Sequence, residues 1–220
     1  MIDFTKYRCV DLTLPYDASV AGYSDEAAKV LEKDGWNARM LHLYSHAGTH
    51  MDAPVHFGIA GPTIDAFTPE QLMGRAWVIH LEDTAPGALL DTGILNGMAE
   101  NIIPGDILLI NTGWSKRLGT DAYRNQLPRI SEALAGWCVR NGIKMLGVEP
   151  PSVADVNNLE EVTLIHQILL SGGVMIVEGL CNLDQLHGNP VWLMALPIKI
   201  KGGDGAPCRV IAFEEMAEGV

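Results

Sequence analysis

Short apolar runs that end at turn residues constrain the fold of this chain more than any other feature. "PGDILLINTG" (104–113) opens with a turn signal and continues as a fully apolar run, which is typical of a buried strand. "NARMLHLYSH" (37–46) alternates apolar and polar residues, which predicts a half-buried strand. By the same reasoning we expect strands at 8–14, 37–46, 76–82, 104–113, 143–149, 174–180, 191–200 and 208–214. None of these runs approaches the roughly 18 apolar residues of a transmembrane helix.

Helical patterns are fewer than strand patterns. Segment 129–142 has Ser131 as an N-cap, a helical apolar stripe and Gly142 after its end. Segment 160–173 is a second helix that ends at a Gly-Gly pair, and shorter helices are expected near 24–34 and at 69–73. No repeat or linker divides the 220 residues, which is a length that suits one domain. The sequence therefore predicts a single mixed, strand-rich α/β domain over residues 1–220.

Composition excludes some classes of function. The formal net charge of −12 argues for a soluble protein and against binding nucleic acid or anionic membrane, because both need a basic surface. The four cysteines are scattered without a C-x-x-C pair, and "MIDFTKYRCVDLTLPYD" has no apolar run of a signal peptide. We therefore expect a cytoplasmic protein with reduced thiols.

The stretch "SHAGTHMDAPVHF" (45–57) gathers an unusual number of metal-binding side chains. Its glycine and proline argue against a helix. In an extended or turning segment alternate positions face the same way, so His46, His50, Asp52 and His56 would lie on one side. Imidazole nitrogens and a carboxylate oxygen are ligands that zinc or manganese accepts. The stretch thus predicts one side of a metal site.

Simpler interpretations apply to several of these residues and to other histidines. The cluster could be surface decoration or an adventitious metal binder. His42 lies on the opposite phase of the approaching strand and His80 lies on a strand outside the histidine cluster, so both are expected to be structural. His166 lies on the apolar helix "VTLIHQILL", where a hydrogen-bonded core histidine is the simpler interpretation. Glu178 ends an apolar strand, a place where a carboxylate is seldom buried without a partner.

The order of residues 46–56 resembles the H-x-G-T-H-x-D-x-P-x-H signature of the metal-dependent cyclase family, which includes bacterial kynurenine formamidases and isatin hydrolases. "HQILLSGGVMIVEGLCNLDQL" is similar to the second half-site of that family, a helix histidine followed twelve residues later by a glutamate. "LMALPIKIKGGDGAPCRVIAF" resembles its C-terminal pair of strands. The layout is compatible from about residue 8 to residue 214. The resemblance implies a swivelling β/β/α fold.

The resemblance also implies a role for each matching residue. It implies metal ligands at His46, His50, Asp52, His166 and Glu178. The first three would hold one cation and the last two a second, with both carboxylates able to bridge. His56 would be the general acid/base. The divalent metal is expected to be zinc or manganese, as one or two ions.

Such a site suits hydrolysis. A cation with an open position lowers the pKa of bound water to roughly 7, so that hydroxide is available at neutral pH. His56 could take a proton from that water and deliver it to a leaving nitrogen. We expect cleavage of an amide-type C–N bond in an N-formylkynurenine-like formamide or an isatin-like lactam. The alternatives are a lactone hydrolase, a lyase or true cyclase that acts through an enolate, and a non-catalytic binder.

The substrate pocket and the assembly are less constrained by the sequence. Tyr23 in "VAGYSDE" lies where the family places an aromatic substrate-binding residue. Glu149 and Ser152 in "EPPS" either line the pocket or form an ordinary turn. Further aromatic candidates for the pocket wall are Trp36, Phe57, Trp114 and Trp192. The resemblance suggests a homodimer or a larger homo-oligomer that takes a small-molecule substrate.

Overall fold

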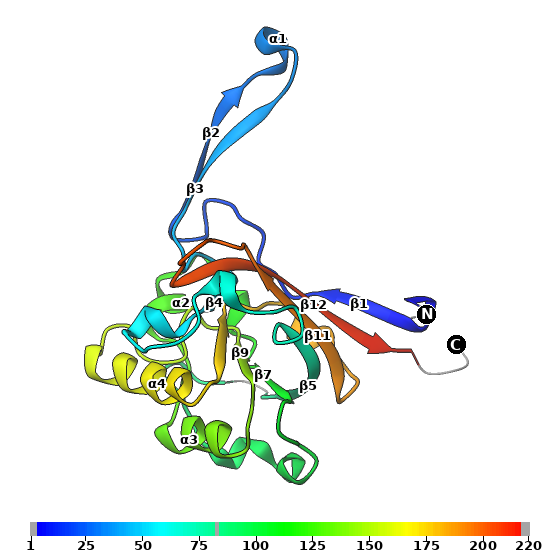
Figure 1. Cartoon of the computed structure of the whole chain (residues 1–220), viewed down its shortest axis with the longest axis vertical. Coiled ribbons are helices and arrows are strands. Elements are labelled where there is room, and N and C mark those ends of the chain that lie inside the picture. Colours follow the sequence, from blue (N-terminus) through cyan, green and yellow to red (C-terminus); the bar gives the residue numbers. More distant parts are fainter. Residues whose placement is uncertain (1–3, 82–83, 217–220) are drawn as a thin grey trace.

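A computed structural model describes residues 4–81 and 84–216, and its main feature is a sheet that closes on itself (Figure 1). The strands of this sheet are β1 (Tyr7–Asp11), β4 (His50–Asp52), β5 (Met73–His80), β7 (Ile107–Asn111), β9 (Met145–Val148), β10 (Met175–Glu178), β11 (Val191–Pro197) and β12 (Gly205–Glu215). Their order is β1-β12-β11-β5-β7-β9-β10-β4, and β4 also pairs with β12. Seven strands therefore close a barrel, and β1 pairs with β12 outside the ring. This strand-rich α/β architecture is the predicted one.

Parallel and antiparallel strands occupy different parts of the barrel. β5, β7, β9 and β10 are parallel neighbours, and β11, β12 and β4 pair antiparallel. Along β7, Ile107 and Leu109 belong to the core inside the barrel, whereas Leu108 and Ile110 pack with the helices. Because β7 is covered on both faces, its run of apolar residues is continuous rather than alternating.

Two helices cover the parallel strands from outside: α3 (Glu132–Arg140) and α4 (Leu159–Ser171). The Ser131 hydroxyl accepts a hydrogen bond from the Leu134 N–H at 3.0 Å, as the N-cap prediction required. Asn158 caps α4 in the same way, accepting from the Glu161 N–H at 3.2 Å. Both helices therefore begin and end within a few residues of the predicted bounds.

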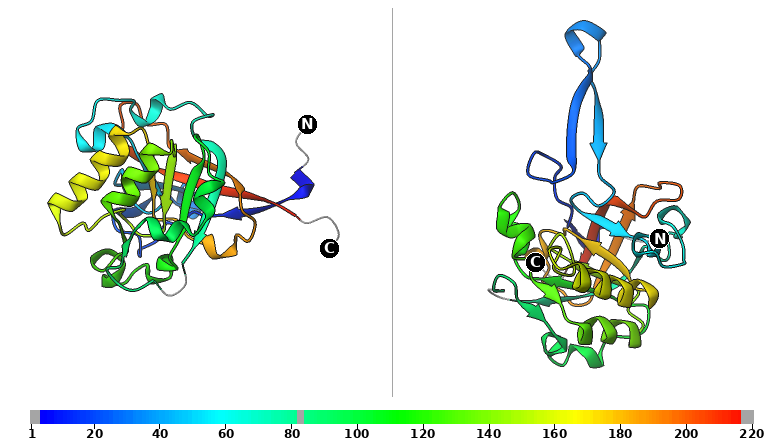
Figure 2. Two further views of the ribbon diagram at one scale, coloured as in Figure 1. Left: turned by 90° about the horizontal axis from the view of Figure 1, so that it is seen from below. Right: turned by 90° about the vertical axis from the view of Figure 1, so that its left-hand side faces the viewer.

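An antiparallel hairpin projects from the barrel (Figures 1 and 2). It consists of β2 (Tyr23–Lys29), the one-turn helix α1 (Leu31–Asp34) and β3 (Ala38–Leu43), and we call residues 23–43 the hairpin arm. The helix predicted over 24–34 is therefore wrong for most of its length. The strand predicted at 37–46 is present but exposed rather than half-buried, because none of the described layers of the barrel packs on it.

The remaining helices and strands are short. They are β6 (Leu89–Leu90), β8 (Arg129–Ile130), α2 (Asp121–Asn125) and the 3-10 helices Phe4–Lys6, Pro54–Phe57, Ile64–Ala66, Thr92–Leu95, Met98–Glu100, Trp114–Arg117 and Leu183–Gln185. The helix predicted at 69–73 is wrong. Single turns stand there instead, closed by the Gln71 and Leu72 N–H groups, before β5 begins.

Two predictions about the whole chain can be compared with this structure. The four cysteines are all free, as expected from their scattered positions. Within residues 4–81 and 84–216, we find no helix with the length and apolar character needed to traverse a bilayer.

Candidate metal centre

The metal-binding side chains of residues 45–57 come from one short strand and the turns on either side of it. His50 and Asp52 are alternate residues of β4 and therefore project to the same side. His46 precedes the strand in a turn, and His56 follows it in a 3-10 helix (Pro54–Phe57). Only His50–Asp52 form the strand itself, so residues 46–56 are a turning rather than a fully extended segment. All four side chains nevertheless converge.

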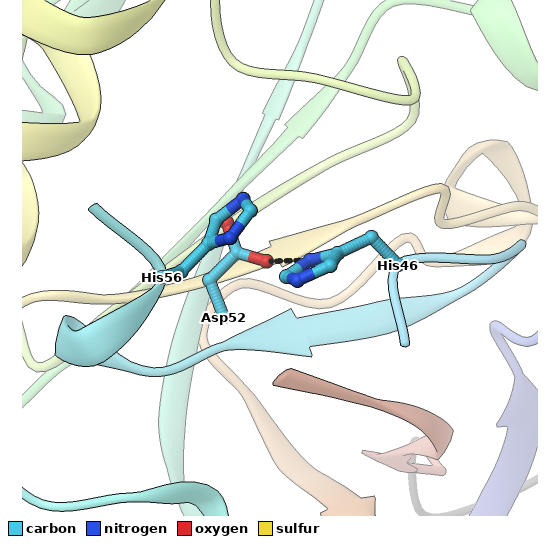
Figure 3. A group of neighbouring side chains, drawn as sticks. All are labelled: His46, Asp52 and His56. Carbon is cyan, nitrogen blue, oxygen red and sulfur yellow. Dashed lines mark hydrogen bonds and ion pairs between the residues drawn. The ribbon is translucent and has the colours of Figure 1, made fainter. Parts of the chain in front are cut away.

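His46, Asp52 and His56 form the first group, shown in Figure 3. His46 Nδ1 lies 2.8 Å from Asp52 Oδ1. The rings of His46 and His56 stack with their centroids 3.7 Å apart. The group places two imidazoles against one carboxylate at the end of the barrel.

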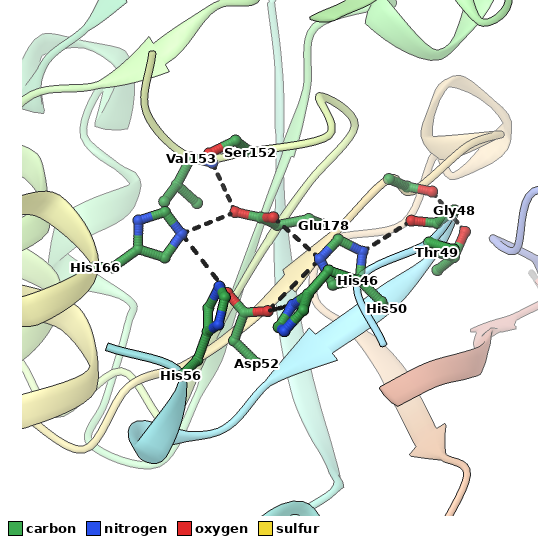
Figure 4. Close-up of polar contacts among 12 residues, drawn as sticks. His46, Gly48, Thr49, His50, Asp52, His56, Ser152, Val153, His166 and Glu178 are labelled. Carbon is green, nitrogen blue, oxygen red and sulfur yellow. Dashed lines mark hydrogen bonds and ion pairs between the residues drawn. The ribbon is translucent and has the colours of Figure 1, made fainter. Parts of the chain in front are cut away.

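Residues from the second half of the chain meet Asp52 from the other side (Figure 4). Glu178 at the end of β10 is in register with His50 of β4, and His50 Nε2 lies 3.2 Å from Glu178 Oε2. His166 of α4 points its Nε2 to within 3.4 Å of Glu178 Oε1 and 3.6 Å of Asp52 Oδ2. The structure thus brings together all the residues that the resemblance grouped into two half-sites.

A glycine next to Glu178 allows this close approach. Gly179 has a φ of +67°, and a Cβ atom there would lie 2.3 Å from the carbonyl oxygen of Gly48. Any side chain at this position would push β10 away from the turn that carries His46. The "EG" pair in the sequence therefore brings Glu178 to its partners.

Hydrogen bonds at Nδ1 orient two histidines so that their Nε2 atoms face the carboxylates, where they could bind a cation. His50 Nδ1 donates to the Gly48 carbonyl oxygen at 2.9 Å, and His166 Nδ1 donates to the Val162 carbonyl oxygen at 2.6 Å. A neutral imidazole whose Nδ1 carries the proton presents a lone pair at Nε2. Metal-ligating histidines are commonly held in this way by a backbone carbonyl.

One buried oxygen provides a direct test of whether a cation fits. Asp52 is fully buried, and its Oδ2 is one of two buried side-chain polar atoms among the described residues that have no hydrogen-bond partner. A buried carboxylate oxygen without a partner is costly. His166 Nε2 lies 3.6 Å from this oxygen, which is too far for a hydrogen bond. A divalent cation bound between these side chains would satisfy Asp52, so the residues present fit a metal ion.

The pKa shifts show that the cluster requires positive charge. Burial alone would lower the pKa of His46, but its hydrogen bonds with Asp52 and Asp204 raise it to about 9. Burial would likewise raise the pKa of Glu178, but the hydrogen bonds from His166 and His50 hold it far below its ordinary value. Protons on the imidazoles therefore balance the charge of the carboxylates.

His56 differs from the other histidines of the site. Burial lowers its pKa below the ordinary value, and Asp52 opposes this while His46 and His166 reinforce it. Its side chain is 24% exposed, against 2–7% for His46, His50 and His166. His56 is therefore a neutral, accessible imidazole at pH 7, as a general base must be.

A cavity of about 720 Å³ opens onto these side chains. Its polar lining includes His46, His50, His56, His166 and Glu178. Apolar walls come from three separated parts of the chain: Val20, Tyr44, Phe57, Val156 and Val162. This volume and this mixture of apolar walls with convergent polar groups are typical of a small-molecule site.

Only some of the predicted pocket residues line the cavity. Tyr23 does not line this cavity. Its hydroxyl donates to Asp25 at 2.5 Å and its ring packs edge-on against Tyr16, so its assignment to the substrate stays a prediction without support from this geometry. Of the other aromatic candidates Phe57 lines the cavity, Trp36 is exposed on the hairpin arm, and Trp114 is buried away from it.

The "EPPS" segment divides between the two interpretations that the sequence left open. Ser152 lines the cavity, whereas the carboxylate of Glu149 points to the loop that follows β7 and accepts four hydrogen bonds there. The histidines expected to be structural lie outside the site. His42 is on the hairpin arm, and His80 contacts Asn111 at the end of β5.

Sequence reasoning missed Asp204. Its Oδ2 lies 3.0 Å from His46 Nε2 and 3.8 Å from His56 Nδ1. It stands immediately before β12, whose first residue pairs with Asp52. The only signal in the sequence was an aspartate in the glycine-rich turn "GGDG", which by itself predicts nothing more than a turn.

Known proteins are similar to this chain in sequence over most of its length. An uncharacterized protein of Methanocaldococcus jannaschii is 31% identical over 193 residues, covering 86% of this chain and 90% of that protein. A kynurenine formamidase of Geobacillus thermodenitrificans is 30% identical over 181 residues, covering 81% of this chain and 80% of the enzyme.

Solved structures show the same fold. Isatin hydrolase A of Ralstonia solanacearum superposes with a TM-score of 0.85 at 24% sequence identity, over 96% of this chain and 93% of that protein. The sequence model of the Cyclase family matches residues 10–155, about two thirds of the chain. The chain therefore belongs to the Cyclase family.

Proposed function

We propose that this chain is a metal-dependent hydrolase that cleaves an amide-type C–N bond in a small aromatic or cyclic substrate. The observation that supports this most strongly is the buried Asp52, whose unpartnered oxygen lies among imidazole nitrogens beside a cavity. The kynurenine formamidase and isatin hydrolase relatives act on a formamide and on isatin, as their names state. We propose substrates of these two kinds.

In this proposal some residues of the chain hold the cation and another transfers protons. His46, His50 and Asp52 would hold one ion, and His166 and Glu178 would hold a second that shares Asp52. When bound, zinc or manganese lowers the pKa of water and polarises a carbonyl oxygen. The side chains supply three imidazoles and two carboxylates, which suits either metal.

His56 is the proposed proton carrier. It is neutral because burial and its imidazole neighbours lower its pKa, and it lines the cavity. A neutral imidazole can accept a proton from water and, as an imidazolium, donate it to the nitrogen that leaves when the C–N bond breaks. Phe57, which stacks on His166 with centroids 4.2 Å apart, would form an apolar wall for an aromatic ring.

The test is turnover of N-formylkynurenine and of isatin by chelator-stripped protein to which zinc or manganese is restored. We expect metal-dependent hydrolysis of at least one substrate, lost in His50→Ala. His42→Ala is the matched control, because this histidine of the same segment is exposed on the hairpin arm. Turnover without incorporation of solvent oxygen into the acid would favour the lyase or cyclase alternative. Metal binding without any turnover would reject both substrates.

We also propose that the chain forms a homodimer or larger homo-oligomer through the hairpin arm. A two-stranded hairpin is only marginally stable in water by itself. Exposed apolar side chains run along the arm and into its base: Val30, Leu31, Trp36, Met40, Leu41, Leu43 and Tyr44. A second copy of the chain packed against them would bury this surface. Light scattering tests this, and a mass near 23.8 kDa would contradict it.

A cytoplasmic location also stays a prediction.

A further inference from the structure

We propose that Asp204 is a positioning residue for the candidate metal ligand His46. Its carboxylate accepts a hydrogen bond from His46 Nε2 and thereby holds the opposite ring nitrogen, Nδ1, toward Asp52, where it could ligate a cation. This inference rests on the proposed metal-dependent function, and it concerns a residue outside the ligand set that the sequence suggested.

The three candidate histidine ligands share one arrangement, and Asp204 completes it. His50 and His166 each turn one ring nitrogen toward the carboxylates and donate the other to a backbone carbonyl. His46 turns Nδ1 toward Asp52, and its partner at the far nitrogen is the side chain of Asp204 at 3.0 Å. Acceptors of this kind fix the tautomer and the orientation of a metal-binding imidazole.

The backbone around Asp204 is built to hold this contact. The Asp204 carbonyl oxygen accepts a hydrogen bond from the Ala53 N–H at 2.8 Å, which ties the residue to the end of β4. The next residue, Gly205, lies directly against the His46 ring. A Cβ atom there would be 2.6 Å from His46 Cε1, so only glycine leaves room for the imidazole beside Asp204.

The position of Asp204 favours an effect on the ligand rather than on the substrate. Asp204 is not among the residues that line the cavity. Its distance of 3.8 Å to His56 Nδ1 is too long for a hydrogen bond. The side chain is 47% exposed, so solvent screens its charge, and its main contribution is the orientation of His46.

The experiment measures zinc affinity directly, by competition between the chelator-stripped protein and a chromophoric chelator. We expect Asp204→Ala to weaken zinc binding about 10- to 100-fold, the range found for partners of metal ligands. Asp204→Asn should recover part of the loss, because its amide oxygen still accepts the hydrogen bond. Asp184→Ala is the matched control, a carboxylate of similar exposure (44%) that pairs with Lys116, and should bind zinc as the parent chain does.

The absorption spectrum of the cobalt-loaded protein gives a second readout, because its bands report the geometry around the ion. We expect altered bands in Asp204→Ala and near-parent bands in Asp204→Asn. Parent-like affinity and spectrum in Asp204→Ala would overturn the inference. Loss of stoichiometric binding in both Asp204 variants would also overturn it and identify Asp204 as a ligand itself. A parent chain that binds neither zinc nor manganese would instead reject the proposed function.

Discussion

Asp52 and Glu149 are both buried carboxylates, but they differ in the hydrogen-bond donors that surround their oxygen atoms. Glu149 Oε2 accepts hydrogen bonds from the Thr112 N–H at 2.7 Å, the Thr112 hydroxyl at 3.1 Å and the Trp114 N–H at 3.0 Å. Its Oε1 accepts from the Ser115 hydroxyl at 2.8 Å. Asp52 Oδ2 has no such donor, and its neighbours are imidazoles.

The difference separates a structural carboxylate from a candidate metal ligand. The donors to Glu149 belong to one loop, residues 112–115, so this carboxylate holds that loop in place. The polar atoms around Asp52 are candidate ligand atoms themselves and cannot all donate to one another. Burial alone does not distinguish Asp52 from Glu149. The number of carboxylate oxygens that accept hydrogen bonds does distinguish them.

The largest expected effect is that of Asp52→Asn. An amide is a poor replacement for a carboxylate ligand, so the variant should lose stoichiometric metal and fall to background turnover. Metal content after dialysis and the rate of hydrolysis are the measurements. If the variant kept its full metal content, Asp52 would not be a metal ligand and would not differ from Glu149 in function.

His56→Ala should have the next largest effect. Removing a general acid/base costs about 10²- to 10⁴-fold in rate, and the metal content should stay at the parent level. Rates and metal content are measured on the same sample. If the metal were lost together with the activity, His56 would have to be reassigned as a ligand, consistent with its stacking on His46.

Glu149→Gln tests the structural side of the contrast. A glutamine amide group cannot accept all four hydrogen bonds, so the free energy of unfolding should fall by about 1–3 kcal/mol. Zinc affinity should not change. Urea unfolding and chelator competition measure the two quantities, with Glu26→Gln on the exposed hairpin arm as control. Weaker zinc binding at unchanged stability would place Glu149 in the site.

Asp106 provides the smallest and most graded effect. Burial would raise its pKa, but hydrogen bonds from Arg75, Ile103 and Trp77 hold it below the ordinary value. A carboxylate with a lowered folded-state pKa stabilises the fold above its unfolded pKa of about 3.9, and this contribution is lost as the pH falls through the folded value. Asp106→Asn should flatten the acid limb of stability measured by urea unfolding from pH 6 to pH 3. An unchanged acid limb would contradict this.

The local parts of the site were predictable from the sequence. His46, His50, Asp52 and His56 are close in the chain, so their spacing alone indicated a shared face. His166 gave no such signal, because it lies far from Asp52 in the sequence and the two come together through the long-range pairing of β10 with β4. Its assignment as a ligand came from the family resemblance. Asp204 depends on the pairing of β12 with β4, which closes the barrel and leaves no pattern in the sequence.

The fold shows the same division between local and long-range information. Caps such as Ser131 and the continuous apolar run of β7 act within a few residues, and the elements that they predict are present. Segment 23–29, "YSDEAAK", has helix-forming composition but pairs as a strand with β3 in the hairpin arm. Pairing with the other strand of the hairpin overrides the intrinsic preference of this segment.

The most direct test of the metal centre is anomalous diffraction from crystals of the zinc-loaded protein. We expect an anomalous peak in contact with Asp52 and with the ring nitrogens of His46 and His50. Anomalous peaks only at surface histidines such as His42, with none beside Asp52, would contradict the proposed metal centre.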